Sequence, residues 1–164
     1  MIFGMTPFTF VHVAVSVVGI ASGLVVLVGL MTGKALAGWT ALFLITTVAT
    51  NVSGFGFPFG TFLPSHWIGV MSLVVLAVAI VARYPLRLAR AWRWIYVVSA
   101  VTALYLNVFV LVVQLFRKVP ALQALAPTQS EPPFQFTQLL VLVLFAVLGV
   151  FAVKGFRAPP APMV

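Results

Sequence analysis

Five long apolar runs, separated by short polar segments, dominate the chain. They cover about residues 8–31, 37–53, 66–82, 92–116 and 134–153. Most come near the roughly 20 residues that a helix needs to cross about 30 Å of hydrocarbon. Strands are not expected, because open strands leave backbone groups unpaired in lipid and the runs lack the period of a barrel strand. The pattern predicts an all-α integral membrane bundle of five transmembrane helices.

The second and third runs are the shortest, so four spans plus a re-entrant segment form the alternative. We expect residues 1–157 to make a single transmembrane helical domain and residues 158–164, with the sequence APPAPMV, to make a disordered C-terminal tail. The first basic residue is Lys34, and the run before it is longer than a signal-peptide core. The first span is therefore expected to be retained.

Composition supports a membrane protein over a water-soluble one. The 164 residues are 63% hydrophobic and 6% charged, whereas about a quarter of a soluble domain is charged. Nine Lys and Arg against one acid give a net charge of +8. Because the basic residues lie between apolar runs, the expected partners are anionic lipid headgroups and not nucleic acid. The chain has no cysteine, which excludes disulfides and thiolate metal sites.

The basic residues are distributed unequally over the two sides that five spans define. Two of the nine, Arg117 and Lys118, lie on one side. The other seven lie on the opposite side: Lys34, Arg83, Arg87, Arg90, Arg93, Lys154 and Arg157. The positive-inside rule makes the side with seven cytoplasmic. We therefore expect the N-terminus to lie outside and the C-terminus to lie in the cytoplasm.

Four of these basic residues lie in one short segment, ARYPLRLARAWR. Arg83, Arg87, Arg90 and Arg93 are spaced by four, three and three, so they would share one helical face if Pro85 did not interrupt the turn. We expect anionic headgroups near these arginines. A topology signal with snorkelling anchors is the simpler interpretation, and a docking strip for a partner is another.

Polar side chains gather in the outer half of the predicted bundle. In the first run His12, Ser16, Gly19 and Gly23 share one helical face, which is small enough to pack on another helix or to admit a flat ligand. Further polar residues of this half are Thr46, Thr47, Thr50, Asn51, Ser53, Ser65, His66, Ser72, Gln114, Gln135, Thr137 and Gln138, and Asn107 lies near mid-depth. The pattern predicts a polar pocket that opens outward.

His12 and His66 are the two histidines of the chain, and each lies near the outer start of a span. Two imidazoles at equal depth are able to ligate one b-type haem, and Gly19 and Gly69 would leave room for the macrocycle. Asn107 and Gln114 complete the candidate cofactor-binding set. A divalent metal held by His12, His66 and Glu131 is a second hypothesis, and histidines hydrogen-bonded to neighbouring spans are the simpler interpretation.

Glu131 is the sole acid of the chain, so catalysis by paired carboxylates is excluded. It stands beside Ser130 and two prolines, a pattern typical of the N-terminal cap of the fifth span, with Ser130 or Thr128 as further capping residues. A proton-accepting or cation-binding role is the alternative.

The first outer loop, GFGFPFGTFLPSH, alternates phenylalanine with glycine and proline, so it is apolar yet unable to continue a helix. Such a loop is expected to lie in the membrane interface or to fold back over the bundle. There it would serve as an interfacial anchor or cover a hydrophobic ligand such as a quinone.

The segment YLNVFVLVVQLF, followed by KVP, ALAPTQSEPPF and QLLVLVLF, resembles a group of small bacterial multi-span inner-membrane proteins with no known activity. The GFGFP loop followed by PSHWIG is similar as well, so the resemblance covers most of residues 8–157. It implies a bacterial inner-membrane protein and transfers no site residue.

These patterns favour a non-catalytic accessory subunit, in a larger complex or a homo-oligomer, or a bundle that binds a hydrophobic ligand. The alternative is a redox component with one haem b or a quinone. A transporter or channel is disfavoured, because polar residues do not continue through the full depth of the membrane. Phosphate-loop and zinc-site motifs do not occur in the sequence.

Overall fold

The computed structural model describes residues 6–57 and 64–156, and in this part of the chain it contains helices and no strand. The helices are α1 Pro7–Met31, α2 Ala37–Gly54, α3 Pro64–Arg83, α4 Trp92–Lys118, α5 Pro120–Leu125 and α6 Pro132–Gly155. The prediction of an all-α fold is confirmed, and the five predicted runs coincide with α1, α2, α3, α4 and α6. The short helix α5 was not predicted. The expected disordered tail, residues 158–164, lies outside the described residues.

Four of the described helices are long and apolar enough to cross a membrane: α1, residues His66–Arg83 of α3, α4 and α6. The chain is therefore a small multi-pass membrane protein. Helix α2 is not among the four, because Thr46, Thr47, Thr50 and Asn51 dilute its apolar side chains. The count of five spans stays a prediction.

Proline and glycine define most helix ends. Pro7, Pro120 and Pro132 occupy first-turn positions, where a missing N–H costs nothing. At the end of α1, Gly33 adopts a φ of +73°. Its N–H donates to Leu30 O, and the N–H of Lys34 donates to Gly29 O, the two bonds of a Schellman motif. The chain can therefore turn within a few residues from α1 into α2.

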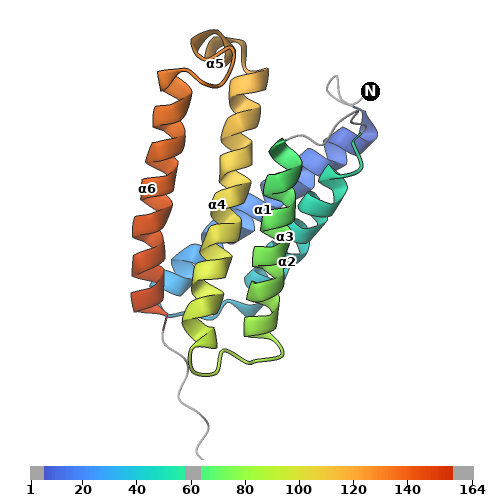
Figure 1. Ribbon diagram of the computed structural model, residues 1–164. Helices are drawn as coiled ribbons and strands as arrows, with labels where there is room; N and C mark the ends of the chain where they lie inside the picture. Colours follow the sequence, from blue (N-terminus) through green and yellow to red (C-terminus); the bar gives the residue numbers. More distant parts are fainter. Residues whose placement is uncertain (1–5, 58–63, 157–164) are drawn as a thin grey trace, which may run out of the picture.

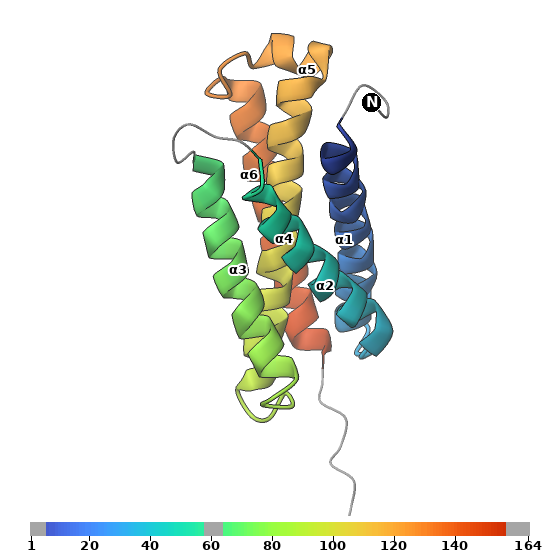
Figure 2. The same ribbon diagram turned by 90° about the vertical axis from the view of Figure 1, so that its right-hand side faces the viewer.

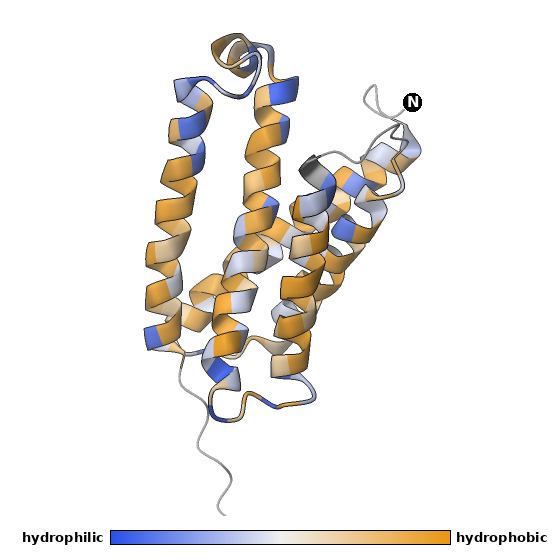
Figure 3. Ribbon diagram, in the orientation of Figure 1, coloured by the Kyte–Doolittle hydropathy of each residue, from blue (hydrophilic) through white to orange (hydrophobic). Residues whose placement is uncertain are grey.

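The long helices run alternately up and down between two ends of the bundle (Figure 1). The start of α1, the end of α2, the start of α3 and helix α5 lie at one end, which corresponds to the predicted outer end. Helix α2 lies between α1 and α3, and α4 packs against α3, α6 and α1 (Figure 2). Hydrophobic positions fill the middle of the helices, and hydrophilic ones cluster toward their ends (Figure 3).

The main core lies in the half of the bundle opposite α5, which corresponds to the predicted cytoplasmic half. It contains the second half of α1, the first half of α2, the second half of α3, the first half of α4 and the end of α6. Its largest fully buried side chains are Tyr96, Phe43 and Phe156. Near α5, a smaller cluster joins Val112 and Phe116 to Ala126. The helices are therefore held together most extensively in the half opposite α5, the inner half, and less extensively in the outer half near α5.

Helix α6 packs through one narrow stripe. Its buried residues are Gln138, Phe145 and Ala152, which are seven residues apart and so lie on one face. The remaining faces expose apolar side chains, among them Leu140, 69% exposed. Such a surface needs lipid or another apolar partner to cover it.

Candidate functional site

His12 is hydrogen-bonded to helix α2. Its Nδ1 lies 2.8 Å from the hydroxyl oxygen of Ser53, in a half-buried position. Its ring also meets the ring of Phe57 edge-on, with centroids 5.0 Å apart. The side chain therefore contacts the end of α2 and the segment that follows.

His66 is 7% exposed, and it packs against a different residue of the same segment. Its ring centroid lies 5.6 Å from that of Phe55, the C-cap residue that follows α2. Each histidine thus contacts its own phenylalanine, His12 from α1 and His66 from α3, while α2 lies between those two helices. The aromatic loop therefore folds back over the bundle in its described part. Phe59 and Phe62, the other half of the proposed ligand cover, lie outside the described residues.

The space beside the two glycines of the haem hypothesis is occupied by α2 and its end. A Cβ at Gly19 would lie 3.2 Å from Thr46 Oγ1, and a Cβ at Gly69 would lie 3.2 Å from Phe55 Cζ. These glycines admit neighbouring side chains of the protein itself, as the helix-packing interpretation predicts. One haem between His12 and His66 stays a prediction. A visible absorption spectrum of the purified protein tests it, because bound haem gives a Soret band.

The two amide residues of the candidate set have different surroundings. Asn107 Nδ2 donates to Thr47 Oγ1 at 3.2 Å and so connects α4 with α2. Gln114 lies one heptad further on the same face of α4, yet it is exposed. Toward the end of the bundle near α5, helix α1 diverges from α4 (Figure 1). Asn107 therefore takes part in helix packing, whereas Gln114 lies on the surface.

Glu131 occupies the N-cap position of α6, as predicted, but its side chain does not cap the helix. Its carboxylate instead accepts hydrogen bonds from the hydroxyl and N–H of Thr128, at 2.9 and 3.1 Å, and from the N–H of Ser130 at 3.1 Å. The reason is that Pro132 and Pro133 have no N–H, and Glu131 O already accepts from the N–H of Phe134. The carboxylate therefore accepts hydrogen bonds from the loop before α6 and not from the first turn of the helix.

Desolvation raises the pKa of Glu131, but the hydrogen bonds from Thr128 and Ser130 together lower it more, so its pKa lies below the ordinary value. The described residues contain no group of three or more His, Cys, Asp or Glu side chains that would hold a metal ion. Glu131 thus does not join His12 and His66 in one cluster.

The four clustered arginines divide into two pairs. Arg83 lies over the buried ring of Tyr96, with its Cζ 5.3 Å from the ring centroid. Arg93 donates to Phe156 O at the end of α6. Arg87 and Arg90 are exposed in the turn after α3, both with positive φ. A continuous arginine face does not form, since α3 ends at Arg83 just before Pro85.

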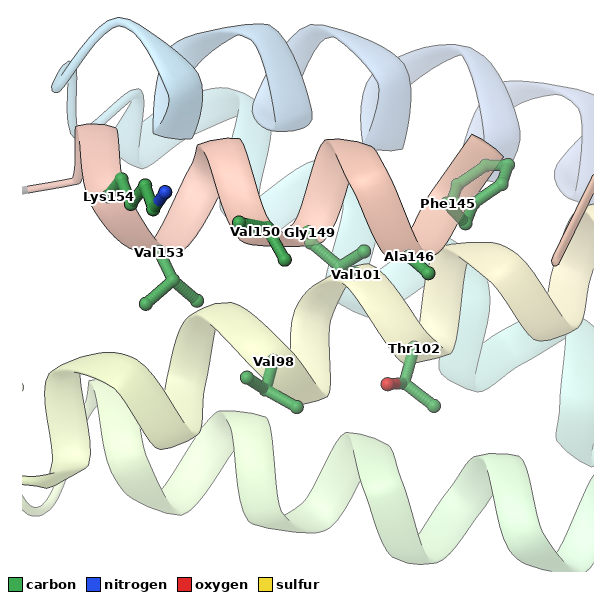
Figure 4. A pocket seen from close by; sticks show the side chains of 9 residues that line it. All are labelled: Val98, Val101, Thr102, Phe145, Ala146, Gly149, Val150, Val153 and Lys154. Carbon is green, nitrogen blue, oxygen red and sulfur yellow. The ribbon is translucent and has the colours of Figure 1, made fainter. Parts of the chain in front are cut away.

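A groove that the sequence did not indicate lies between α4 and α6 in the inner half (Figure 4). It has a volume of about 360 Å³ and is lined by Val98, Val101 and Thr102 of α4 and by α6 residues between Phe145 and Lys154. A smaller, polar pocket lies at the outer end, where Arg117, Gln123 and Thr128 contribute to its wall. The histidines line neither. The sequence signal that could have indicated this groove is the alternation of small and larger residues along α6, as at Ala146 and Val150.

Comparisons of the chain with protein-family models, with curated proteins and with solved structures find no match.

Proposed function

We propose that the chain is a non-catalytic, five-span protein of a bacterial inner membrane that binds hydrophobic molecules of the bilayer. Its N-terminus lies outside and its C-terminus lies in the cytoplasm. The groove between α4 and α6 is the observation that carries this proposal, because it is apolar, open and lies on the surface that lipid would cover.

The length of α2 and the hydrogen bonds within it support a fifth span. Its 18 residues extend about 27 Å at 1.5 Å per residue, close to the thickness of the hydrocarbon core. Its polar side chains are hydrogen-bonded to backbone carbonyls one turn earlier in the same helix: Asn51 Nδ2 donates to Thr47 O, and Thr46 Oγ1 donates to Leu42 O. Such bonds reduce the cost of placing these residues in lipid.

The arrangement of helix ends supports the orientation. Lys34, Arg87 and Lys154 lie at the end of the bundle opposite α5, whereas Arg117 and Lys118 lie beside α5 (Figure 1). The excess of basic residues at one end is what the positive-inside rule associates with the cytoplasm.

The exposed apolar surface supports a role in binding hydrophobic molecules. Groove residues Val98 and Val150 are 45% and 53% exposed, so an apolar molecule in the bilayer has direct access to them. Polar groups on the opposite side of the bundle are engaged in helix packing, as with His12 on Ser53 and Asn107 on Thr47. The chain thus meets the bilayer through exposed apolar side chains, of which α6 carries the largest share.

Photo-crosslinking tests the binding function. A benzoylphenylalanine residue at Val150, in the groove, is compared with one at Val147 on the same helix but outside the groove. We expect adducts of lipid-sized mass at both positions, more abundant at Val150. Adducts to one other protein at both positions would contradict the proposal and favour an accessory subunit.

Labelling tests the topology with little background, since the chain has no native cysteine. Single cysteines at Gln129 and Arg87 are treated with a membrane-impermeant maleimide in intact cells. We expect Gln129→Cys to react and Arg87→Cys to react after permeabilisation alone. The reverse result would invert the proposed orientation.

A further inference from the structure

The groove between α4 and α6 has one charged residue at one of its ends. On the α6 side its wall is apolar from Phe145 to Val153, and Lys154 follows in the last turn of the helix. In Figure 4 the Lys154 side chain lies at one end of the groove and Phe145 at the other. A ligand of this groove therefore has a long apolar part and an anionic group at one end.

The length of the groove matches one leaflet of a bilayer. Nine residues separate Phe145 from Lys154, which corresponds to about 14 Å along a helix. One leaflet contributes about 15 Å of hydrocarbon, half of the 30 Å core. An acyl chain that begins at the level of Lys154 thus ends at the level of Phe145, near the middle of the membrane.

The two helices leave space for a chain because small residues line the α6 side. Ala146 and Gly149 face the groove, and α4 offers Val98 and Thr102 opposite them. The helices are held at this distance by independent contacts: the ring centroids of Tyr105 and Phe145 lie 5.9 Å apart, and Gln138 Nε2 donates to Phe109 O. The groove is therefore part of the packed structure.

We propose that this groove holds one acyl chain of an anionic phospholipid from the cytoplasmic leaflet, and that the Lys154 ammonium group binds the phosphate of that lipid. The charge complements the headgroup, and the apolar wall complements the chain. This inference rests on the proposed orientation, which places Lys154 at the inner boundary. Lys154 is thus a specific lipid-binding residue in addition to a topology anchor.

A phospholipid with a photoactivatable diazirine near the end of one acyl chain tests the inference. The full chain is reconstituted in bilayer nanodiscs of phosphatidylcholine that contain the probe as phosphatidylglycerol or as phosphatidylcholine. After irradiation, adducts are mapped by mass spectrometry. We expect them to concentrate between Phe145 and Gly149 and on Val101 and Thr102, and to be more abundant with the anionic probe.

Matched variants separate the groove from general contact with lipid. Ala146→Phe fills the groove from α6, and Val98→Phe fills it independently from α4. Both residues are exposed, so the added ring does not enter the core. We expect either variant to lose most of the adducts, whereas Val147→Phe, outside the groove, keeps them.

Charge variants test the headgroup contact. A basic residue at an anionic membrane surface contributes about 1 kcal/mol, which corresponds to about a fivefold change in binding. We expect Lys154→Gln to lose about fivefold of the preference for the anionic probe and Lys34→Gln, at the same end of the bundle, to retain it. Lys154→Arg keeps the charge and should keep the preference.

Three outcomes would overturn the inference. Adducts spread evenly along all exposed faces of α6, unaffected by Ala146→Phe and Val98→Phe, would show that the groove holds no particular lipid, although the chain spans the membrane. Equal labelling by both probes with no effect of Lys154→Gln would remove the headgroup contact. A chain without acyl adducts anywhere on α6 would contradict the proposed membrane surface itself, which the cysteine labelling tests separately.

Discussion

The inner and outer halves of the bundle are held together by different kinds of contact. At the inner end, α1 and α6 approach so closely that a Cβ at Gly155 would clash with the backbone oxygen of Met31. At the outer end, α1 and α2 are connected by the hydrogen bond between His12 and Ser53 and by the ring of Phe57. Small residues thus set the distance between α1 and α6 at the inner end. Polar and aromatic side chains connect α1 with α2 at the outer end.

This difference in contacts indicates which half of the bundle can change its packing. In a membrane, helices associate through close packing, with hydrogen bonds as a smaller contribution. Most of the buried polar atoms that lack a hydrogen-bond partner lie in the outer half, Thr50 Oγ1, Ser72 Oγ and Gln138 Oε1, and one, Tyr96 Oη, lies in the inner half. Such atoms favour a change of partner when a donor becomes available, because each unsatisfied group costs about 1–3 kcal/mol. The inner half should therefore determine stability, and the outer half should tolerate rearrangement.

Truncation of one phenylalanine in each half makes the strongest test. Phe43 is 1% exposed in the inner core, and its ring lies against Gly23. Phe43→Ala should cost about 3–5 kcal/mol, since a buried cavity is left. Phe57→Ala, at a half-buried outer position, should cost less than half as much. Reversible unfolding in mixed micelles measures both, and equal costs would contradict the proposed division.

Addition of one methyl group at the closest helix contact should have a smaller effect. Gly155→Ala places its Cβ against the backbone of Met31, which cannot move aside as a side chain can. Overpacking of this kind costs about 1–3 kcal/mol. Gly38→Ala is the matched control, because a Cβ there has no neighbour within 4 Å. The control should unfold at or slightly above the wild-type denaturant concentration, and similar losses in both variants would remove the close contact as the cause.

The helices and the sharing of faces were predictable from the sequence, because hydrophobicity and proline position act locally. The face of His12, Gly19 and Gly23 was predicted to pack on a helix or to admit a ligand, and the structure shows helix packing. The groove between α4 and α6 was not predictable. It depends on the distance between two helices, which the contact of Tyr105 with Phe145 sets across 40 residues.

Candidate site residues also show that contacts between helices were not predictable from the sequence pattern. Asn107 and Gln114 share a face of α4, and both were predicted to belong to the cofactor-binding set. Their surroundings differ, because Asn107 donates to Thr47 of α2 whereas Gln114 is exposed. Glu131 was correctly predicted at the start of a helix, but the following prolines direct its carboxylate to Thr128 instead. Local patterns identify positions, and tertiary structure determines partners.

This difference along α4 predicts a modest, asymmetric effect on stability. Asn107→Leu removes the hydrogen bond to Thr47, and interhelical bonds of this kind contribute about 0.6 kcal/mol and at most about 1.7. Gln114→Leu replaces an exposed side chain and should leave stability unchanged. The unfolding assay used for Phe43→Ala measures both variants. Equal losses would show that the two amides have equivalent surroundings, in contradiction to the structure.

The smallest expected effect concerns the outer loop and its single carboxylate. Because the hydrogen bonds from Thr128 and Ser130 lower the pKa of Glu131, the ionised form stabilises the folded loop. The sign follows from linkage: this contribution is complete above the pKa of the unfolded chain and is lost as the pH falls through the lower pKa of the folded loop. Protection of the Thr128 and Ser130 amides against hydrogen exchange, relative to the intrinsic rate, should therefore be constant above about pH 4.5 and decline below it.

Glu131→Gln separates the carboxylate from other effects of acid on this loop. The amide oxygen of the variant still accepts one hydrogen bond but carries no charge and does not titrate in this range. We expect weaker protection of both amides at neutral pH and no dependence on pH. Protection that increased as the pH fell, or that titrated equally in the variant, would mean that the loop is held by contacts other than those of Glu131. The loop would then resemble the inner half, where packing and not charge determines the structure.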